Sequence, residues 1–450
     1  MRELSISLSQ VKGRVVWPSD PDFDEIRRPF LGGWDRSPAV IVRVADAADV
    51  AIVLAAARTT GLPLAVRSGG HSLHCLVDDG IVLDLHDLRA VDIDVANRTA
   101  WAGPGATAAE YTAAAEAHGL MTGFGDTGSV GLGGLVTGGG LGYLIRAFGL
   151  TVDDLLAAEI VTADGRHLLV DAEHHPDLFW GIRGGGGNFG VVTRLKLRLH
   201  KLSAVYGGLL VLPATAELLA DYMRLSLEAP EELSSILNVM PAPPMPMVPE
   251  ELWGQMVAMA MLVYVGGPED GEKAVAPFRA LAEPLMDMVA PMPYSAVYMM
   301  EDPDYHPMAL SRTTFLDEFD ADKAEQILAR LRMPTSAMPA CQLRALGGAM
   351  ARVPADATAF AHRDRAFLAT AAVVYLDAAE EETHKAWAVE FGTMMRGWSG
   401  GGSYVNFLYD DEMDRIHEAY PPATWERLVR IKQQYDPENL FRGNANIPPK

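Results

Sequence analysis

The residues with the clearest chemical potential stand together at residues 67–72, where the sequence reads Arg-Ser-Gly-Gly-His-Ser. Two adjacent glycines let the backbone approach a ligand closely and turn its N–H groups towards an anion. An imidazole that directly follows such a turn, here His71, lies beside whatever the turn holds. We interpret this loop as part of a nucleotide site with His71 tied to the ligand. A tight turn that carries an ordinary surface histidine is the alternative.

Two more glycine clusters follow, at residues 123–149 and 184–190. The first of them also carries apolar residues, among them Val130 and Leu132, whereas a flexible linker, the alternative interpretation, is usually polar. So much glycine in one place indicates a backbone wrapped closely around a ligand. The three clusters together favour a flavin dinucleotide as that ligand.

Short apolar runs and capped helices alternate around these loops and must position them. Asp46 and Gly61 delimit a predicted helix over residues 47–60, and Thr107 with Glu110 forms a capping box for a helix that ends at Gly119. Apolar runs predict strands at residues 40–44, 62–66, 81–85, 91–101, 155–162, 166–171 and 191–199. This alternation predicts an α+β or α/β layer architecture.

The composition of the chain shifts after about residue 203, where we place a domain boundary. Helices are predicted over residues 214–229, 271–286, 321–332, 378–395 and 424–435, with a strand at 367–376. A segment rich in proline and methionine spans residues 241–300. Methionine fills irregular apolar space, so this segment is either core filler or the lining of a binding pocket.

The overall charge and cysteine usage exclude several classes of function. The formal net charge of the 450 residues is −22, which repels phosphate backbones, so we expect no nucleic-acid partner. Two cysteines cannot form a disulfide framework. No apolar stretch reaches the ~18 residues of a membrane helix, and residues 1–6 do not resemble a signal peptide. We therefore expect a cytoplasmic protein without a membrane association.

The order of these pieces resembles the berberine bridge enzyme-like group of the vanillyl-alcohol oxidase flavoprotein superfamily. The motifs that carry the resemblance are residues 67–72, 130–154, 180–193, Tyr404-x-Asn406 and 435–441. The resemblance spans nearly the whole chain and implies an α+β fold. Residues 1–203 would form a PCMH-type FAD-binding domain of two α+β subdomains, residues 204–410 a substrate domain with an antiparallel sheet backed by helices, and residues 411–450 a segment that returns to the FAD-binding domain.

The same resemblance implies FAD bonded covalently through His71. Some family members add a second bond through a cysteine, but that position is Thr127 here, so a single bond is expected. Val130 stands where a small residue leaves room for dioxygen in oxidase members. Contacts with the cofactor are implied for Arg67, Ser68, Gly69, Gly70, His71, Ser72, Thr127, Ser129, Val130, Gly133, Gly134, Gly138, Gly142, Val192, Tyr404, Asn406 and Asn444.

A flavin that oxidises a C–H bond takes a hydride at N5, while a base removes the proton of the attached O–H or N–H group. Tyr404 matches the family tyrosine and is the predicted base; the alternative is that it only packs on the flavin ring. The strand at residues 367–376 has no carboxylate, which leaves Thr370 and Tyr375 as substrate-pocket groups. Asn406 and Asn444 are expected to position Tyr404 or the flavin edge.

The predicted function is a flavin oxidase that acts on an alcohol, amine or activated C–H of a small, mostly apolar metabolite and passes electrons to O2, releasing H2O2. A flavin dehydrogenase with another acceptor and a non-catalytic flavin-binding protein are the alternatives. No metal site is expected, because His71, His74 and Cys75 lack a fourth ligand. The protein is expected to be a monomer or homodimer.

Overall fold

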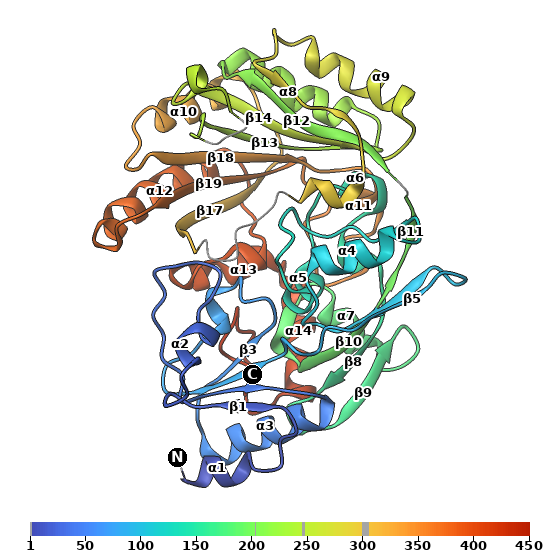
Figure 1. The fold of residues 1–450 in the computed structure, drawn as a ribbon, viewed down its shortest axis with the longest axis vertical. Helices are drawn as coiled ribbons and strands as arrows, with labels where there is room; N and C mark the ends of the chain where they lie inside the picture. Colours follow the sequence, from blue (N-terminus) through green and yellow to red (C-terminus); the bar gives the residue numbers. More distant parts are fainter. Residues whose placement is uncertain (1, 203, 245–247, 299–305) are drawn as a thin grey trace.

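The computed structural model describes residues 2–202, 204–244, 248–298 and 306–450, which form two halves joined along one side (Figure 1). The lower half contains both ends of the described chain. It holds a four-stranded, a five-stranded and a two-stranded sheet, and the upper half holds one large sheet with helices on its outer face. The mixture of helices and sheets confirms the α+β fold class.

The first small sheet carries the Arg67–Ser72 loop. Its order is β1 (Arg14–Val16), β2 (Val40–Arg43), β4 (Ile81–Asp84) and β3 (Leu64–Arg67), with β2 and β3 parallel to β4. Helix α3 (Ala47–Thr60) packs against it, begins at the Asp46 cap and ends at Gly61 with φ +69°, as predicted. Short helices α1 (Arg2–Ser7) and α2 (Phe23–Ile26) complete this subdomain.

The second sheet is antiparallel and five-stranded. Its order is β5 (Val91–Asp94), β6 (Thr99–Ala102), β10 (Val191–Arg198), β8 (Leu155–Val161) and β9 (His167–Asp171). The prediction of one strand over residues 91–101 is wrong. Asp94 accepts hydrogen bonds from Asn97, and Arg98 has φ +50°, so the chain turns back as a hairpin. The hairpin through Asp164-Gly165 is confirmed.

Helices of this half surround the glycine loops. The capping box of Thr107 and Glu110 is confirmed at the start of α4 (Ala108–Glu116). The cluster at residues 123–149 contains α5 (Leu132–Gly138) and α6 (Ile145–Phe148), and α7 (Pro176–Ile182) precedes the third cluster. A two-stranded sheet pairs β7 (Leu120–Met121) with β11 (His200–Lys201).

The upper sheet is antiparallel, as the resemblance implied. Its strands follow the order β15 (Met286–Asp287), β12 (Val205–Pro213), β14 (Met256–Tyr264), β13 (Leu233–Pro241), β18 (Met338–Ala345), β19 (Phe367–Tyr375) and β17 (Met308–Leu316), with β16 (Ala290–Met292) also paired to β12. Helices α8 (Ala216–Glu228), α9 (Pro268–Arg279), α10 (Ala321–Leu331) and α12 (Glu381–Arg396) share a core with one face of the sheet (Figure 1).

One expectation for this half needs correction. The helix predicted over residues 271–286 ends at Arg279, shortly after Pro277, and Met286 belongs to β15 instead. Within the methionine-rich segment, Met256, Met259 and Met261 lie in β14. Of the remaining methionines, Met288 is exposed, and Met245, Met247, Met299 and Met300 lie outside the described residues.

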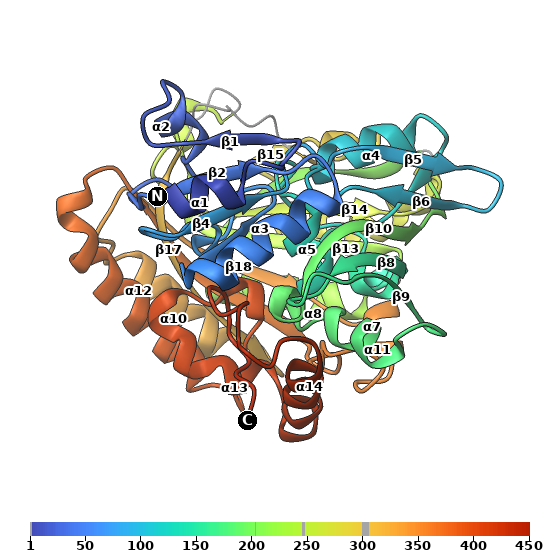
Figure 2. The ribbon, with the colours of Figure 1, turned by 90° about the horizontal axis from the view of Figure 1, so that it is seen from below.

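The C-terminal segment returns to the lower half. Helix α14 (Pro422–Tyr435) lies beside α7 (Figure 2), and α11 (Ala349–Arg352) and α13 (Ile416–Ala419) lie between the two halves. The buried Lys432 ammonium donates to the Asn188 carbonyl oxygen at 2.9 Å and pairs with Asp436 at 2.7 Å. Asn188 in turn bonds both Ala445 and Ile447, which ties the tail to the third glycine cluster. No described helix is long and apolar enough to cross a membrane.

Candidate active site

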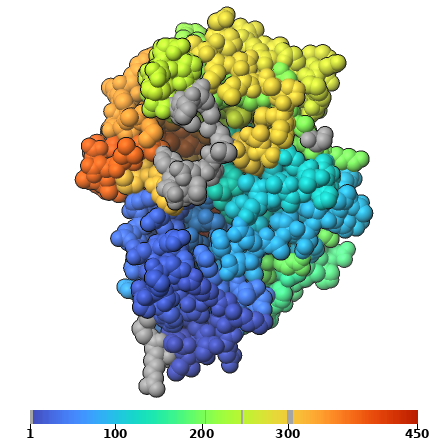
Figure 3. Space-filling view, in the orientation of Figure 1, coloured from blue at the N-terminus to red at the C-terminus, as the bar shows by residue number. Residues whose placement is uncertain are grey.

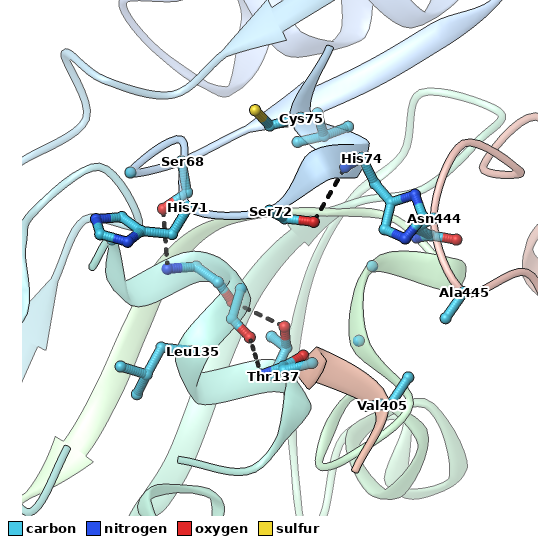
Figure 4. A pocket seen from close by; sticks show the side chains of 18 of the residues that line it. Ser68, His71, Ser72, His74, Cys75, Leu135, Thr137, Val405, Asn444 and Ala445 are labelled. Carbon is cyan, nitrogen blue, oxygen red and sulfur yellow. Dashed lines mark hydrogen bonds between the residues drawn. The ribbon is translucent and has the colours of Figure 1, made fainter. Parts of the chain in front are cut away.

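A cavity of about 470 Å³ lies where the three glycine loops meet the edge of the upper sheet. Figure 3 shows a hollow between the two halves on one face of the molecule, and Figure 4 shows the cavity from close by. Segments far apart in sequence contribute to its wall. The predicted cofactor residues that line it are Ser68, Gly69, Gly70, His71, Ser72, Thr127, Val130, Gly133, Gly134, Val192, Tyr404, Asn406 and Asn444.

The first two glycine loops touch each other through their backbones. A Cβ atom on Gly69 would lie 2.2 Å from the Gly131 nitrogen, so a side chain at that position would push the loops apart. The Ser68 hydroxyl donates to the Pro104 carbonyl oxygen at 2.5 Å and accepts from the Gly133 N–H at 3.3 Å. Glycine at these positions therefore allows the two loops to form one continuous wall.

His71 lies on this wall and is held by residues of two other segments. Its Nε2 atom is 2.9 Å from the Ser129 hydroxyl oxygen, which comes from the second glycine loop. The ring of Phe30 stacks on the imidazole with a centroid distance of 4.1 Å and an interplanar angle of 20°. His74 and Asn444 lie next to each other, away from His71, in Figure 4.

Tyr404 is buried, and its hydroxyl oxygen accepts two hydrogen bonds. The Gly140 N–H donates at 2.9 Å and the Asn406 side-chain amide at 3.0 Å. Burial raises the pKa of Tyr404 to about 12, although both donors and the charge of Arg344 oppose this rise. Donors that point at a phenol oxygen favour its ionised form. The arrangement can therefore support proton transfer by Tyr404.

A partly buried ion pair joins the second glycine loop to the upper sheet. Arg344 of β18 donates to the Asp126 carboxylate at 2.7 Å and to the Leu141 carbonyl oxygen at 3.0 Å, and its guanidinium lies 5.6 Å from the centre of the Phe407 ring. Asp126, Leu141 and Phe407 all line the cavity. The sequence analysis missed Asp126, Arg344 and Phe30. The one sequence signal that could have pointed to this pair is the position of Arg344 within a strand.

Four predicted cofactor residues lie behind the cavity wall rather than in it. Arg67 donates to backbone oxygens of Ile26 and Arg28, and Ser129 holds His71. Gly138 and Gly142 let neighbouring groups approach their backbones closely. A Cβ atom on Gly138 would lie 2.1 Å from Asn406 Oδ1, and one on Gly142 would lie 1.7 Å from the Phe124 carbonyl oxygen.

The two predicted substrate-pocket residues of β19 lie outside the cavity lining. Thr370 is half-buried and bonds the Thr313 hydroxyl at 3.1 Å, on the sheet face opposite the helices. Tyr375 packs against His384 of α12, with ring centroids 4.7 Å apart, because its odd-numbered position points to the helix-covered face.

The residues present fit a dinucleotide cofactor better than a metal ion. Among the described residues, no group of three or more histidines, cysteines and carboxylates could hold a metal. Both cysteines are buried, and burial raises the pKa of Cys75 to about 11. The Asn444 Oδ1 atom is buried on the cavity wall without a partner in the described structure, so it is an acceptor for a ligand.

This fold and this cavity define an FAD-binding oxidoreductase of the PCMH type. Residues 38–171 match the model of an FAD binding domain, and residues 403–448 match the berberine and berberine-like model. These matches support a berberine bridge enzyme-like FAD-linked oxidoreductase of the vanillyl-alcohol oxidase superfamily.

The sequences of several relatives align with this chain over nearly their whole length. It is 29% identical to (R)-6-hydroxynicotine oxidase of Paenarthrobacter nicotinovorans, over 98% of this chain and 97% of that one, and 29% identical to the FAD-linked oxidoreductase YgaK of Bacillus subtilis (strain 168), over 98% of both chains. The crystal structure of 6-hydroxy-D-nicotine oxidase from Arthrobacter nicotinovorans superposes with a TM-score of 0.89 at 28% identity, over 98% of this chain and 99% of that one. Physcomitrella patens BBE-like 1, at 22% identity and a TM-score of 0.89, shares the fold over 99% of both chains.

Proposed function

We propose that the chain is an FAD-dependent oxidase that acts on an alcohol, amine or activated C–H of a small metabolite. The observation that carries this proposal is the buried Tyr404 hydroxyl, which lines the FAD cavity and accepts hydrogen bonds from Gly140 and Asn406. A protein that merely stores a flavin has no need of such a group. We also propose that residues 1–203, 204–410 and 411–450 form the three functional segments.

Bound FAD supplies the acceptor for a hydride from the substrate carbon. The residues of this chain bind the cofactor and transfer the proton. The glycine loops and Asn444 bind and orient the cofactor. The Tyr404 oxygen takes the proton of the substrate O–H or N–H group, while the Gly140 N–H and the Asn406 amide stabilise the charge on that oxygen.

The sheet face opposite the helices supports a mostly apolar substrate with one hydrogen-bonding group. Met240, Met259 and Met261 are half-buried there. Beside them a polar row crosses four strands in register, from Asn238 through Gln342 and Thr370 to Thr313. Gln342 donates to Asn238 at 3.1 Å and accepts from Arg344 at 2.8 Å, which links the row to the cavity.

The position of Val130 supports dioxygen as the electron acceptor. Val130 lines the cavity next to Ser129, and its side chain is small at the place where the family resemblance implies an oxygen path. A dehydrogenase that uses another acceptor is the close alternative. We propose the oxidase because (R)-6-hydroxynicotine oxidase, a relative that matches over nearly the whole chain, is named an oxidase.

We propose that FAD is attached covalently through His71, whose ring lies on the cavity wall between Phe30 and Ser129. Protein precipitated with acid should then remain yellow. The substitution His71→Ala should release FAD into the supernatant while the folded protein still binds it. A colourless wild-type pellet would reject the attachment.

A substrate screen tests the oxidase proposal. Each compound is added to the holoenzyme without oxygen, bleaching of the flavin is followed, and air is then admitted. (R)-6-hydroxynicotine is the first compound to test, because a relative is named for it. Rapid return of the yellow colour with H2O2 release identifies an oxidase. Return of the colour only with an added acceptor identifies a dehydrogenase, and the absence of bleaching across alcohols, amines and N-heterocycles contradicts the proposal.

A further inference from the structure

We propose that Ser129 is the positioning residue for covalent attachment of the cofactor, and that it acts through His71. This inference rests on the proposed bond between His71 and FAD and identifies the group that prepares the imidazole for it. Ser129 is not among the residues that line the cavity, and we therefore assign its effect to its contact with His71. Its hydroxyl oxygen lies 2.9 Å from Nε2 of His71.

Ser129 is well suited to hold a ring because its own backbone is fixed on both sides. The Gly128 and Val130 carbonyl oxygens accept hydrogen bonds from the Ala109 N–H at 2.9 Å and the Ala108 N–H at 3.0 Å. Both donors belong to the first turn of α4, which the Thr107 capping box stabilises. The turn that carries the hydroxyl is therefore held against the start of α4.

The imidazole is also restrained on its face. Phe30 stacks on it at 4.1 Å, which sets the plane of the ring. A half-turn about the Cβ–Cγ bond keeps that plane but exchanges the two edges of the imidazole, and the contact between Ser129 and Nε2 favours one of the two orientations. The two contacts together orient the ring, because stacking sets its plane and the hydrogen bond selects the edge that faces Ser129.

The chemistry of attachment shows what the hydroxyl contributes. One C–H bond of the flavin 8α-methyl group breaks, and one bond forms between its carbon and a ring nitrogen of His71. The ring thereby becomes cationic and must give up its N–H proton. The two electrons and two protons released reduce the flavin, and dioxygen takes them up as hydrogen peroxide.

A Ser129 oxygen that accepts from the Nε2–H group favours bond formation in two ways. It selects the tautomer that carries the proton on Nε2, which leaves Nδ1 free to attack the 8α carbon, and it stabilises the cationic ring until the Nε2 proton leaves. A hydrogen bond to a charged group contributes about 1.5–3 kcal/mol. Attachment should therefore be slower by at least about 10-fold when the hydroxyl is removed, since 1.4 kcal/mol corresponds to a factor of 10.

The test measures attachment and not turnover. Full-length protein without cofactor is mixed with FAD in air, samples are precipitated with acid at intervals, and flavin fluorescence that stays with the protein is measured. We expect Ser129→Ala to bind FAD but to attach it at least about 10-fold more slowly. Ser129→Thr keeps the hydroxyl and should restore the rate. Ser129→Cys has nearly the same size with a weaker acceptor, so it should be slow, and it provides the measurement if the alanine variant does not fold.

The pH dependence separates positioning from packing. Because the hydroxyl also stabilises the protonated, non-nucleophilic ring, the attachment rate of the wild type should begin to fall at a higher pH than that of Ser129→Ala, whereas a packing role would leave the two pH profiles parallel. Equal attachment rates in wild type, Ser129→Ala and Ser129→Cys would overturn the inference. If His71→Ala still retains covalent flavin, the proposed attachment site fails instead, so the two failures are distinguishable.

Discussion

At the scale of single residues, the phenol of Tyr404 is subject to two opposing effects. Burial raises its pKa to about 12, which keeps the proton on the oxygen at neutral pH. Hydrogen bonds from Gly140 and Asn406 and the positive charge of Arg344 act in the other direction. The proton leaves Tyr404 more easily as more positive charge or more donors approach its oxygen, and a bound cofactor and substrate change that balance.

Tyr404→Phe should lower the rate of flavin reduction by substrate at least ~100-fold, the usual contribution of a positioned acid–base group. Stopped-flow absorbance without oxygen measures this rate. Tyr222→Phe removes an equally buried hydroxyl behind the sheet, where Tyr222 bonds Ser235 at 2.6 Å, and should leave the rate unchanged. A Tyr404→Phe variant that is reduced as fast as wild type would assign the proton transfer to another group.

The pH profile provides a second check on Tyr404. Because its pKa lies at about 12, above the ordinary value of about 10, the phenolate fraction grows with every step of pH across the accessible range. The rate of reduction should therefore rise as pH rises, and this rise should be absent in Tyr404→Phe. A wild-type rate that falls with increasing pH would contradict phenolate as the base.

Residue identity could be predicted where a local motif carries it. His71, Tyr404 and Asn406 follow from short sequence patterns, and all three line the cavity. The pair of Asp126 and Arg344 could not be predicted in this way, because 218 residues separate the partners and their meeting depends on how the upper sheet docks on the loops.

At the scale of elements, the short helix α5 approaches the Tyr404-x-Asn406 segment so closely that only glycine fits at position 138. A Cβ atom there would lie 2.1 Å from Oδ1 and 2.4 Å from Cγ of Asn406. Asn406 also donates to the Gly134 carbonyl oxygen of the same helix at 3.2 Å. The glycine thus allows Asn406 to reach both the helix and Tyr404.

Gly138→Ala should displace the Asn406 side chain and remove one donor from Tyr404. The overpacked contact should cost about 1–3 kcal/mol of unfolding free energy, and flavin reduction should slow because the Tyr404 oxygen loses support for its charge. Urea unfolding and stopped-flow reduction measure the two effects. Gly267→Ala, at a helix start where a Cβ atom meets nothing within 4 Å, is the matched control. Unchanged stability and rate in Gly138→Ala would show that Asn406 has room to move.

Element types were more predictable than element partners. Helices α3 and α4 carry their caps in the sequence, and the Asp164-Gly165 hairpin carries its turn. The long strands β13, β14 and β18 lack comparable capping or turn residues. Their alternation is concealed by methionine and other apolar residues on the sheet face opposite the helices, so the pattern resembles a buried run.

At the scale of the whole molecule, Arg146 joins the two halves. Its buried guanidinium extends from α6 into the upper half and donates to the carbonyl oxygens of Leu233 at 3.0 Å, Leu346 at 2.7 Å and Ala229 at 2.9 Å. An ion pair, Asp153 with the buried Arg363 at 2.7 Å, crosses the same interface. The position of the upper sheet relative to the lower half depends on these contacts.

Arg146→Met should fill the space but leave buried carbonyl oxygens without donors, at about 1–3 kcal/mol for each group. We therefore expect a loss of at least about 3 kcal/mol in the free energy of unfolding, measured by urea denaturation. Arg224→Met removes an exposed arginine that pairs with Asp221 and Glu228 on α8, and it should change stability by less than about 1 kcal/mol. Similar losses in both variants would mean that Arg146 does not hold the halves together.

The return of the tail to the lower half has a consequence for biosynthesis. Gly443, Asn444 and Ala445 line the cavity, yet they follow every strand of the upper sheet in the order of translation. A nascent chain on the ribosome therefore exposes an open groove rather than a finished pocket, even after all three glycine clusters, His71 included, have emerged. We expect the cofactor to bind only after residues 443–445 have been synthesised and the tail has docked against Asn188.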